Sequence, residues 1–239
     1  LFKIFYYQYN RCNNCRYCKN FKSFTYSLIS VCGHKSVKIK KEYSPSGIDY
    51  SEAYKNHSAA VKKRLESVIE KADKLILPGV GAFCDAIKKL KETGLDVVIK
   101  EQVKKGKPLL GICLGMQLLF EKSFEYGEFD GLGLIKGNIV PLEGKISPEL
   151  KIPHIGWNSL EFKNGKSPLF KYIINGDFVY FVHSYFASDC DENVIATSEY
   201  GIDVTASVQK DNVFGCQFHP EKSGDVGLNI LKAFCEMGD

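Results

Sequence analysis

The sequence has no apolar run near the roughly 20 residues that a helix needs to cross a lipid bilayer. Its N-terminus, LFKIFYYQYN, is aromatic and soon becomes polar, which is a poor match to a secretory signal peptide. It also lacks long blocks of Lys or Arg, and the formal net charge is only +4. We therefore expect a cytoplasmic protein that binds neither membranes nor nucleic acid.

Cysteine is not scarce, but its pattern argues against a disulfide framework. The nine cysteines are an odd number, in a chain of 239 residues that is long enough to bury a core without such bonds. Cys12, Cys15 and Cys18 have a spacing that zinc and iron–sulfur sites use, with Cys32 as a candidate fourth ligand. Coincidence in a segment rich in Asn, Tyr, Cys and Lys is the favoured interpretation, so we expect free thiols and no metal or cofactor.

Apolar periodicity predicts an α/β fold. Strands are expected at 74–77, 109–113, 134–140, 177–187, 204–209 and 213–218, and helices at 61–71, 83–94, 95–105, 114–124 and 225–237. Strands that alternate with helices at short spacing favour a mixed, mainly parallel sheet flanked by helices. The polar segment 40–59 indicates a loop or insertion, so 1–60 is a divergent N-terminal segment, in which 3–7 suits a first strand followed by a loop, and 61–239 is a single domain.

The segment Gly111-Ile-Cys-Leu-Gly115 follows an apolar run and precedes a helical pattern. A nucleophile at a sharp strand-to-helix turn needs small residues two positions before and after it, so that the backbone can pass close by. The following helix N-terminus would favour the thiolate of Cys113. Taken alone, a buried cysteine between packing glycines is the more common explanation.

Two further motifs strengthen the interpretation of Cys113 as a catalytic thiol. His219 and Glu221 flank Pro220, and in an extended stretch their side chains point the same way, as a base and its orienting carboxylate would. The glycine-rich segment 77–82 follows a strand and can supply a backbone N–H to an oxyanion, as can Leu114.

Together these motifs resemble the class I, or triad, glutamine amidotransferases. Longer stretches are similar to the glutaminase subunits of imidazole glycerol phosphate synthase, and the resemblance covers about residue 71 to the end. These stretches are PGVGAF at 78–83, GICLGMQ at 111–117, IPHIGWN at 152–158, YFVHSY at 180–185 and QFHPEK at 217–222.

The resemblance implies a mechanism. Cys113 would attack the side-chain amide of glutamine, while His219 transfers protons and Glu221 orients it. The N–H groups of Gly81 and Leu114 would bind the oxyanion. Gln117 and the backbone of His183, Ser184 and Tyr185 would hold glutamine.

The resemblance also implies a partner, a cyclase subunit with a (β/α)₈ barrel that receives the ammonia and makes imidazole glycerol phosphate and an aminoimidazole carboxamide nucleotide. Implied partner-facing positions are Pro153, Trp157, Asn158, Tyr180 and Lys222. Trp157 is the single tryptophan, and as a large aromatic residue it suits either a core or an interface.

Other functions remain open at this point. A related glutaminase could feed another synthase, such as one that amidates a sugar nucleotide. The N-terminal cysteines favour a metal-binding or regulatory variant that lost activity, whereas the intact triad opposes it. A thiol protease fits the chemistry but gives no role to Gln117 or to the Gly-Trp-Asn segment.

Overall fold

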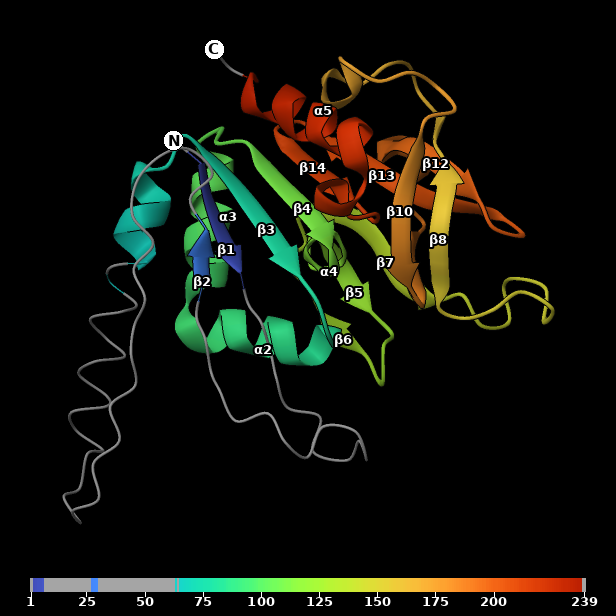
Figure 1. Ribbon diagram of the computed structural model, residues 1–239. Helices are drawn as coiled ribbons and strands as arrows, with labels where there is room; N and C mark the ends of the chain where they lie inside the picture. Colours follow the sequence, from blue (N-terminus) through green and yellow to red (C-terminus); the bar gives the residue numbers. More distant parts are fainter. Residues whose placement is uncertain (1, 7–26, 30–62, 64, 238–239) are drawn as a thin grey trace, which may run out of the picture.

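The computed structural model describes residues 2–6, 27–29, 63 and 65–237 (Figure 1). Its large sheet has eight strands. They are β1 (Phe2–Tyr6), β2 (Ser27–Ile29), β3 (Lys74–Gly79), β4 (Leu109–Cys113), β9 (Glu161–Phe162), β12 (Val194–Glu199), β13 (Asp203–Lys210) and β14 (Val213–Cys216). The order across the sheet is β2-β1-β3-β4-β14-β13-β12-β9.

The four strands β1, β3, β4 and β14 are parallel, and the strands on either side of them are antiparallel. The sheet is mixed, as predicted. The prediction of a mainly parallel sheet holds for the centre and is wrong for the outer strands.

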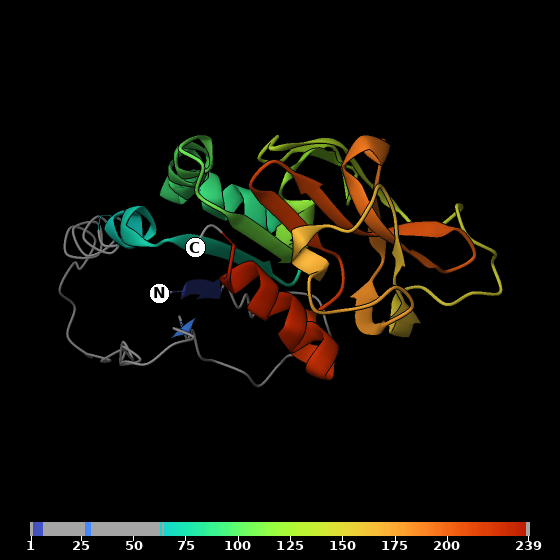
Figure 2. The same cartoon turned by 90° about the horizontal axis from the view of Figure 1, so that it is seen from above.

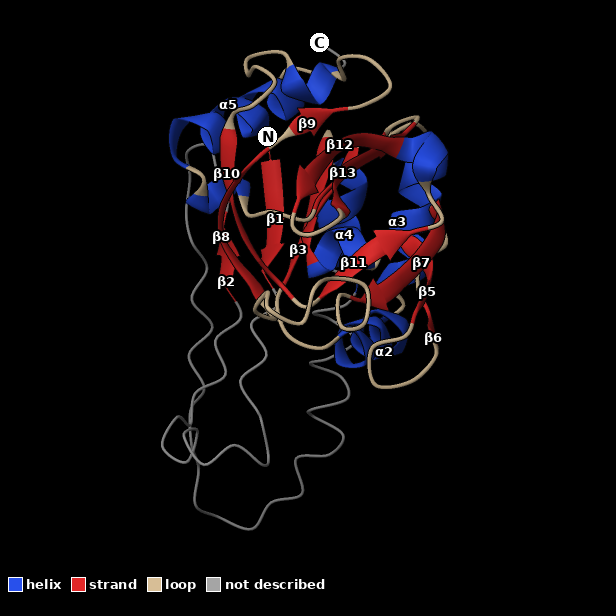
Figure 3. Cartoon of the chain, turned by 90° about the vertical axis from the view of Figure 1, so that its right-hand side faces the viewer, coloured by secondary structure: helices blue, strands red, loops and turns tan. Residues whose placement is uncertain are grey.

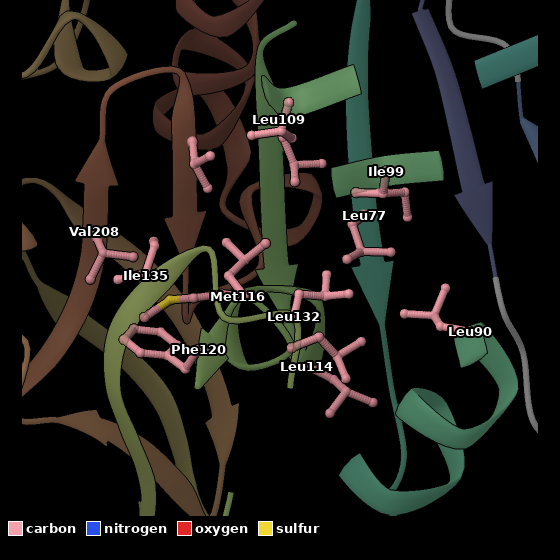
Figure 4. Close-up of a cluster of buried hydrophobic side chains, with 14 of the residues drawn as sticks. Leu77, Leu90, Ile99, Leu109, Leu114, Met116, Phe120, Leu132, Ile135 and Val208 are labelled. Carbon is pink, nitrogen blue, oxygen red and sulfur yellow. The ribbon is translucent and has the colours of Figure 1, made fainter. Parts of the chain in front are cut away.

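Helices cover both faces of the sheet. Helices α2 (Phe83–Thr93) and α3 (Leu95–Lys104) lie on one face, and α5 (Gly224–Cys235) lies on the other (Figure 2). Leu75 and Leu77 of β3 pack with the first group, whereas Ile76 packs with α5, because successive strand residues point to opposite faces. Figure 4 shows Leu77 and other side chains of the first cluster beside α2 and α3.

Two smaller sheets complete the fold (Figure 3). One pairs β8 (His154–Ser159) with β10 (Phe178–His183). The other has the order β11-β7-β5-β6. Its strands are β5 (Phe120–Ser123), β6 (Phe129–Asp130), β7 (Ile135–Pro141) and β11 (Tyr185–Ser188).

Two predicted elements are wrong. The helix expected at 114–124 is only the short α4 (Leu114–Gln117), after which the chain forms β5 and pairs with β7. The strand expected at 177–187 is divided at Ser184 into β10 and β11, which belong to different sheets. The strands expected at 204–209 and 213–218 are present as β13 and β14, which form a hairpin in which Lys210 pairs with Val213.

The expected boundary between 1–60 and 61–239 falls among residues that the structure does not describe. In the described part of the chain, residues 65–71 are helical, in agreement with part of the helix expected at 61–71. None of the helices described is long and apolar enough to cross a membrane.

Candidate active site

Cys113 stands at a sharp turn from β4 into α4. Its backbone has φ of 53° and ψ of −115°, a conformation that is uncommon for a residue with a side chain. A Cβ on Gly111 would lie 2.7 Å from the carbonyl oxygen of Gly115, and one on Gly115 would lie 1.7 Å from that of Leu77. The chain can therefore make this turn only with glycine at both positions, and the predicted strand-to-helix turn is confirmed.

Strand register brings the other two motifs to this turn. Gly79 of β3 is the partner of Cys113, and Cys216 of β14 is the partner of Ile112. The carboxyl ends of parallel strands share one edge of a sheet, which is where open α/β sheets bind ligands. The glycine-rich loop after β3 and the segment after β14, which carries His219, therefore both begin beside Cys113.

Hydrogen bonds hold both the backbone and the imidazole of His219. The backbone N–H of His219 donates to the Tyr180 carbonyl at 2.9 Å, and its carbonyl accepts from the Ser223 hydroxyl at 2.7 Å. Its Nδ1 lies 2.7 Å from Oε1 of Glu221. The contact does not come from an extended stretch, as the sequence analysis expected, because Pro220–Lys222 is a 3₁₀ turn.

The electrostatics couple His219 to its neighbours. Burial alone would lower the pKa of His219, but hydrogen bonding and charge from Cys113 and Glu221 outweigh it and raise this pKa to about 9. Burial likewise opposes the charge on Glu221, yet the bond to His219 leaves the Glu221 pKa lowered. The Nε2 atom of His219 is buried and has no hydrogen bond of good geometry among the described residues, although the thiol is near enough to affect its pKa.

The other cysteine thiols of the described residues do not share this setting. Burial raises the pKa of Cys190 to about 11 and that of Cys216 to about 12, so both stay protonated at neutral pH. Cys84 belongs to α2 and Cys235 ends α5, so neither stands at the turn. Among these five, Cys113 alone stands beside His219.

Gln117 and Gln217 form a buried amide pair next to the thiol. Nε2 of Gln117 donates to the Tyr185 carbonyl at 3.1 Å and to Oε1 of Gln217 at 3.0 Å. Nε2 of Gln217 lies 3.9 Å from Sγ of Cys113. No role was predicted for Gln217 from the sequence. Its position directly after the strand at 213–216, which ends at the same sheet edge as β4, could have indicated that it lies near the thiol.

The segment 183–185 passes close to the thiol. Sγ of Cys113 lies 3.9 Å from the Val182 carbonyl, and the Ser184 carbonyl accepts from Leu142 N–H at 2.9 Å. The side chain of His183 is buried, and its Nδ1 lies 2.9 Å from the Tyr185 carbonyl. Its ring therefore supports the segment, whose backbone was the predicted ligand of glutamine.

The loop after β3 has the conformation that a glycine allows. Gly81 has φ of 99°, and no atom lies within 4 Å of a Cβ built on it. The loop ends at α2, where the N–H of Phe83 donates to a Glu125 carboxylate oxygen at 2.5 Å. Burial raises the pKa of Glu125. The other predicted oxyanion donor, Leu114, is the first residue of α4.

The predicted partner-facing residues gather on the β8–β10 pair and beside it. Trp157 is 52% exposed and pairs across the strands with Tyr180, with ring centroids 6.0 Å apart. Nζ of Lys222 lies 6.0 Å from the Tyr180 ring. Pro153 is exposed and directly precedes β8, and Asn158 is half-buried and belongs to β8. Trp157 therefore does not belong to the core.

No group of three or more metal-ligating side chains occurs within the described residues. The candidate ligands Cys12, Cys15, Cys18 and Cys32 lie outside them.

Comparison with known proteins identifies the family. Residues 19–237 match the model of the class-I glutamine amidotransferases. The imidazole glycerol phosphate synthase subunit HisH of Caldanaerobacter subterraneus subsp. tengcongensis is 57% identical over 171 residues, which cover 71% of this chain and 81% of that protein. The HisH subunit of Wolinella succinogenes is 50% identical over 190 residues, covering 76% of this chain and 92% of its own.

A crystal structure of a glutamine amidotransferase has the same fold. It matches with a TM-score of 0.54 at 21% identity and covers 76% of this chain and 94% of its own. The chain belongs to the class-I glutamine amidotransferases and, within them, to the HisH subunits of imidazole glycerol phosphate synthase.

Proposed function

We propose that this chain hydrolyses glutamine for imidazole glycerol phosphate synthase and that Cys113, His219 and Glu221 are its catalytic residues. Family membership carries the reaction and its place in histidine biosynthesis. One observation carries the residue assignment: a thiol on a strained turn stands beside a buried histidine that a carboxylate holds at 2.7 Å. This is the geometry of a nucleophile, a base and an orienting group.

The first half-reaction uses the shared proton of this site. With a pKa of about 9, His219 is a base strong enough to take the thiol proton of Cys113 and hold it at neutral pH. The thiolate attacks the side-chain amide carbon of glutamine. The imidazolium then gives its proton to the leaving nitrogen, so that ammonia departs and a γ-glutamyl thioester remains.

The second half-reaction reverses these roles. Neutral His219 takes a proton from water as the water attacks the thioester, and glutamate leaves as Cys113 is restored. Both steps pass through an oxyanion. The N–H groups of Gly81 and Leu114 are the proposed donors, since both belong to segments that begin at the paired residues Gly79 and Cys113.

Glutamine would lie between Gln117 and the backbone of 183–185. The Tyr185 carbonyl already has two donors, which fix the position of this segment. Burial raises the pKa of Tyr185, and the negative charge of the nearby Glu125 carboxylate raises it further. We propose that Glu125 binds the ammonium group of glutamine, because no cation is among the described partners of this partly buried carboxylate.

The name of the relatives implies a second subunit that uses the ammonia. We propose that this partner is a cyclase with a (β/α)₈ barrel and that it docks on the face formed by Pro153, Trp157, Asn158, Tyr180 and Lys222. The exposed ring of Trp157 beside the half-buried ring of Tyr180 suits the centre of an interface, where aromatic residues are enriched, and Lys222 would lie at its polar rim.

Replacement of the nucleophile tests the assignment. Cys113→Ala should abolish release of glutamate from glutamine, measured with the cyclase subunit and its nucleotide ligand present, while the melting temperature and partner binding stay near those of the unchanged protein. Cys216→Ala is the control, because its thiol is buried and protonated. Near-normal turnover of Cys113→Ala would place the nucleophile elsewhere.

A further inference from the structure

A series of close polar contacts connects the exposed β8–β10 pair with the segment that borders the thiol. The Asn158 amide donates to the Glu199 carbonyl at 3.0 Å, and its Oδ1 lies 3.1 Å from Nε2 of His154. Nδ1 of His154 lies 3.1 Å from Nε2 of His183, and Nδ1 of His183 lies 2.9 Å from the Tyr185 carbonyl. That carbonyl is also the acceptor for Gln117. A histidine with no assigned role, His154, thus stands in the middle of the series.

The acceptor at the inner end fixes where the protons are. A carbonyl oxygen can only accept, so Nδ1 of His183 must carry a hydrogen to bond Tyr185. Burial holds the pKa of His183 at about 3, and its ring is neutral with a lone pair on Nε2. Only an N–H on Nδ1 of His154 completes the bond between the two rings.

The ring of His154 is held in place by stacking. It has no exposed surface and lies between Phe181 and Tyr200, with centroids 4.8 Å and 3.9 Å away. Besides His183, the titratable group in contact is Tyr200, whose hydroxyl donates to the Lys151 carbonyl at 2.7 Å. Such a ring cannot turn away from His183 without breaking this stack.

We propose that His154 is a positioning residue for the glutaminase reaction: its N–H donates to Nε2 of His183 and so stabilises the tautomer and orientation in which Nδ1 of His183 holds the Tyr185 carbonyl that anchors Gln117. This inference rests on the proposed role of 183–185 in holding glutamine. His154 touches neither the thiol nor the substrate. It acts through His183, as a group that sets the tautomer of a neighbouring imidazole does in other hydrolases.

The same count of protons locates the weak link. Two neutral imidazoles supply two N–H groups, whereas the three contacts from Asn158 to Tyr185 need three. The Asn158 amide is oriented by the Glu199 carbonyl and cannot donate to His154 without losing that bond. Nε2 of His154 therefore faces Oδ1 of Asn158 without a proton, directly beside exposed Trp157. Hydrogen bonds therefore connect His154 to the active-site side of the series, whereas none joins His154 to Asn158 on the exposed side.

Imidazole nitrogen spectroscopy tests the proposal independently of activity. Long-range ¹H–¹⁵N spectra of the full chain at neutral pH, with histidines assigned by substitution, should show both His183 and His154 protonated on Nδ1. In His154→Phe, which keeps the stacking but removes the N–H, His183 should become a mixture of tautomers. A wild-type His183 protonated on Nε2 would overturn the proposal, and this outcome does not depend on which residues are catalytic.

Kinetics with the partner subunit give the second readout. His154→Phe should lower kcat/KM for glutamine about tenfold or more, since small displacements of a reacting arrangement are costly. His154→Asn places an amide N–H where Nδ1 stood and should recover most of that loss. Equal losses in both variants at unchanged melting temperature, or no loss in either, would overturn the proposal. Failure of the proposed catalytic assignment would instead appear as turnover in Cys113→Ala.

Discussion

The replacement Gly115→Ala should disrupt the catalytic turn while leaving every reactive group in the chain. The added Cβ would lie 1.7 Å from the Leu77 carbonyl oxygen, whereas real Cβ atoms keep about 3.0 Å, so β3 and the turn must move apart by more than 1 Å. A displacement of about 1 Å at a reacting group costs roughly 100-fold in rate. Overpacking of this kind also lowers the free energy of unfolding by about 1–3 kcal/mol.

The assay is glutamate release with the cyclase subunit present, together with urea unfolding of the free chain. Gly106→Ala is the control for a glycine replacement that creates no steric clash, because no atom lies within 4 Å of a Cβ on Gly106, although its φ is positive, at 90°. It should lose about 1–2 kcal/mol of stability from backbone strain and no turnover. Wild-type turnover and stability in Gly115→Ala would refute the steric argument for the turn.

Three further predictions concern the site and the exposed face. Glu221→Gln should lower the pKa of His219 from about 9 towards its ordinary value of 6.5. The wild type should therefore exceed the variant in free energy of unfolding most near pH 6, and this difference should disappear as the pH rises through 9. Denaturant titrations across this range measure the difference, and a difference that does not change with pH would contradict the prediction. Gln217→Leu should cost about tenfold in kcat/KM for glutamine, because it leaves the Gln117 amide with one acceptor; unchanged kinetics would show that the amide pair is only structural. Trp157→Ala should weaken binding of the cyclase subunit by about 2 kcal/mol in calorimetry and change the melting temperature little, since the ring is 52% exposed; a large fall in melting temperature with unchanged affinity would rule out the interface role.

The local motifs were predictable because their physics is local. The glycines around Cys113 are required by contacts within a few residues of the turn and by one neighbouring strand. The Glu221 carboxylate reaches His219 because only one residue separates them, although through a turn and not the extended stretch that was expected.

Elements whose form depends on distant partners were not predictable in the same way. The apolar run at 118–120 suits a helix or a strand, and pairing with β7 makes Phe120–Ser123 a strand. The apolar run at 177–187 reads as one strand, but its two halves pair with strands of different sheets. Gln217 and His154 were missed because their importance comes from contacts with residues far away in the chain.

The sequence by itself determined the turn, the order of the proposed catalytic groups and the family, because these depend on steric rules and residue identities along the chain. Only the tertiary structure decided that Trp157 is exposed, that Gln217 lies between Gln117 and the thiol, and that buried His183 contacts both His154 and the Tyr185 carbonyl. These contacts follow from the pairing of β8 with β10 and of β14 with β4, and the register of such pairs depends on contacts across the whole domain.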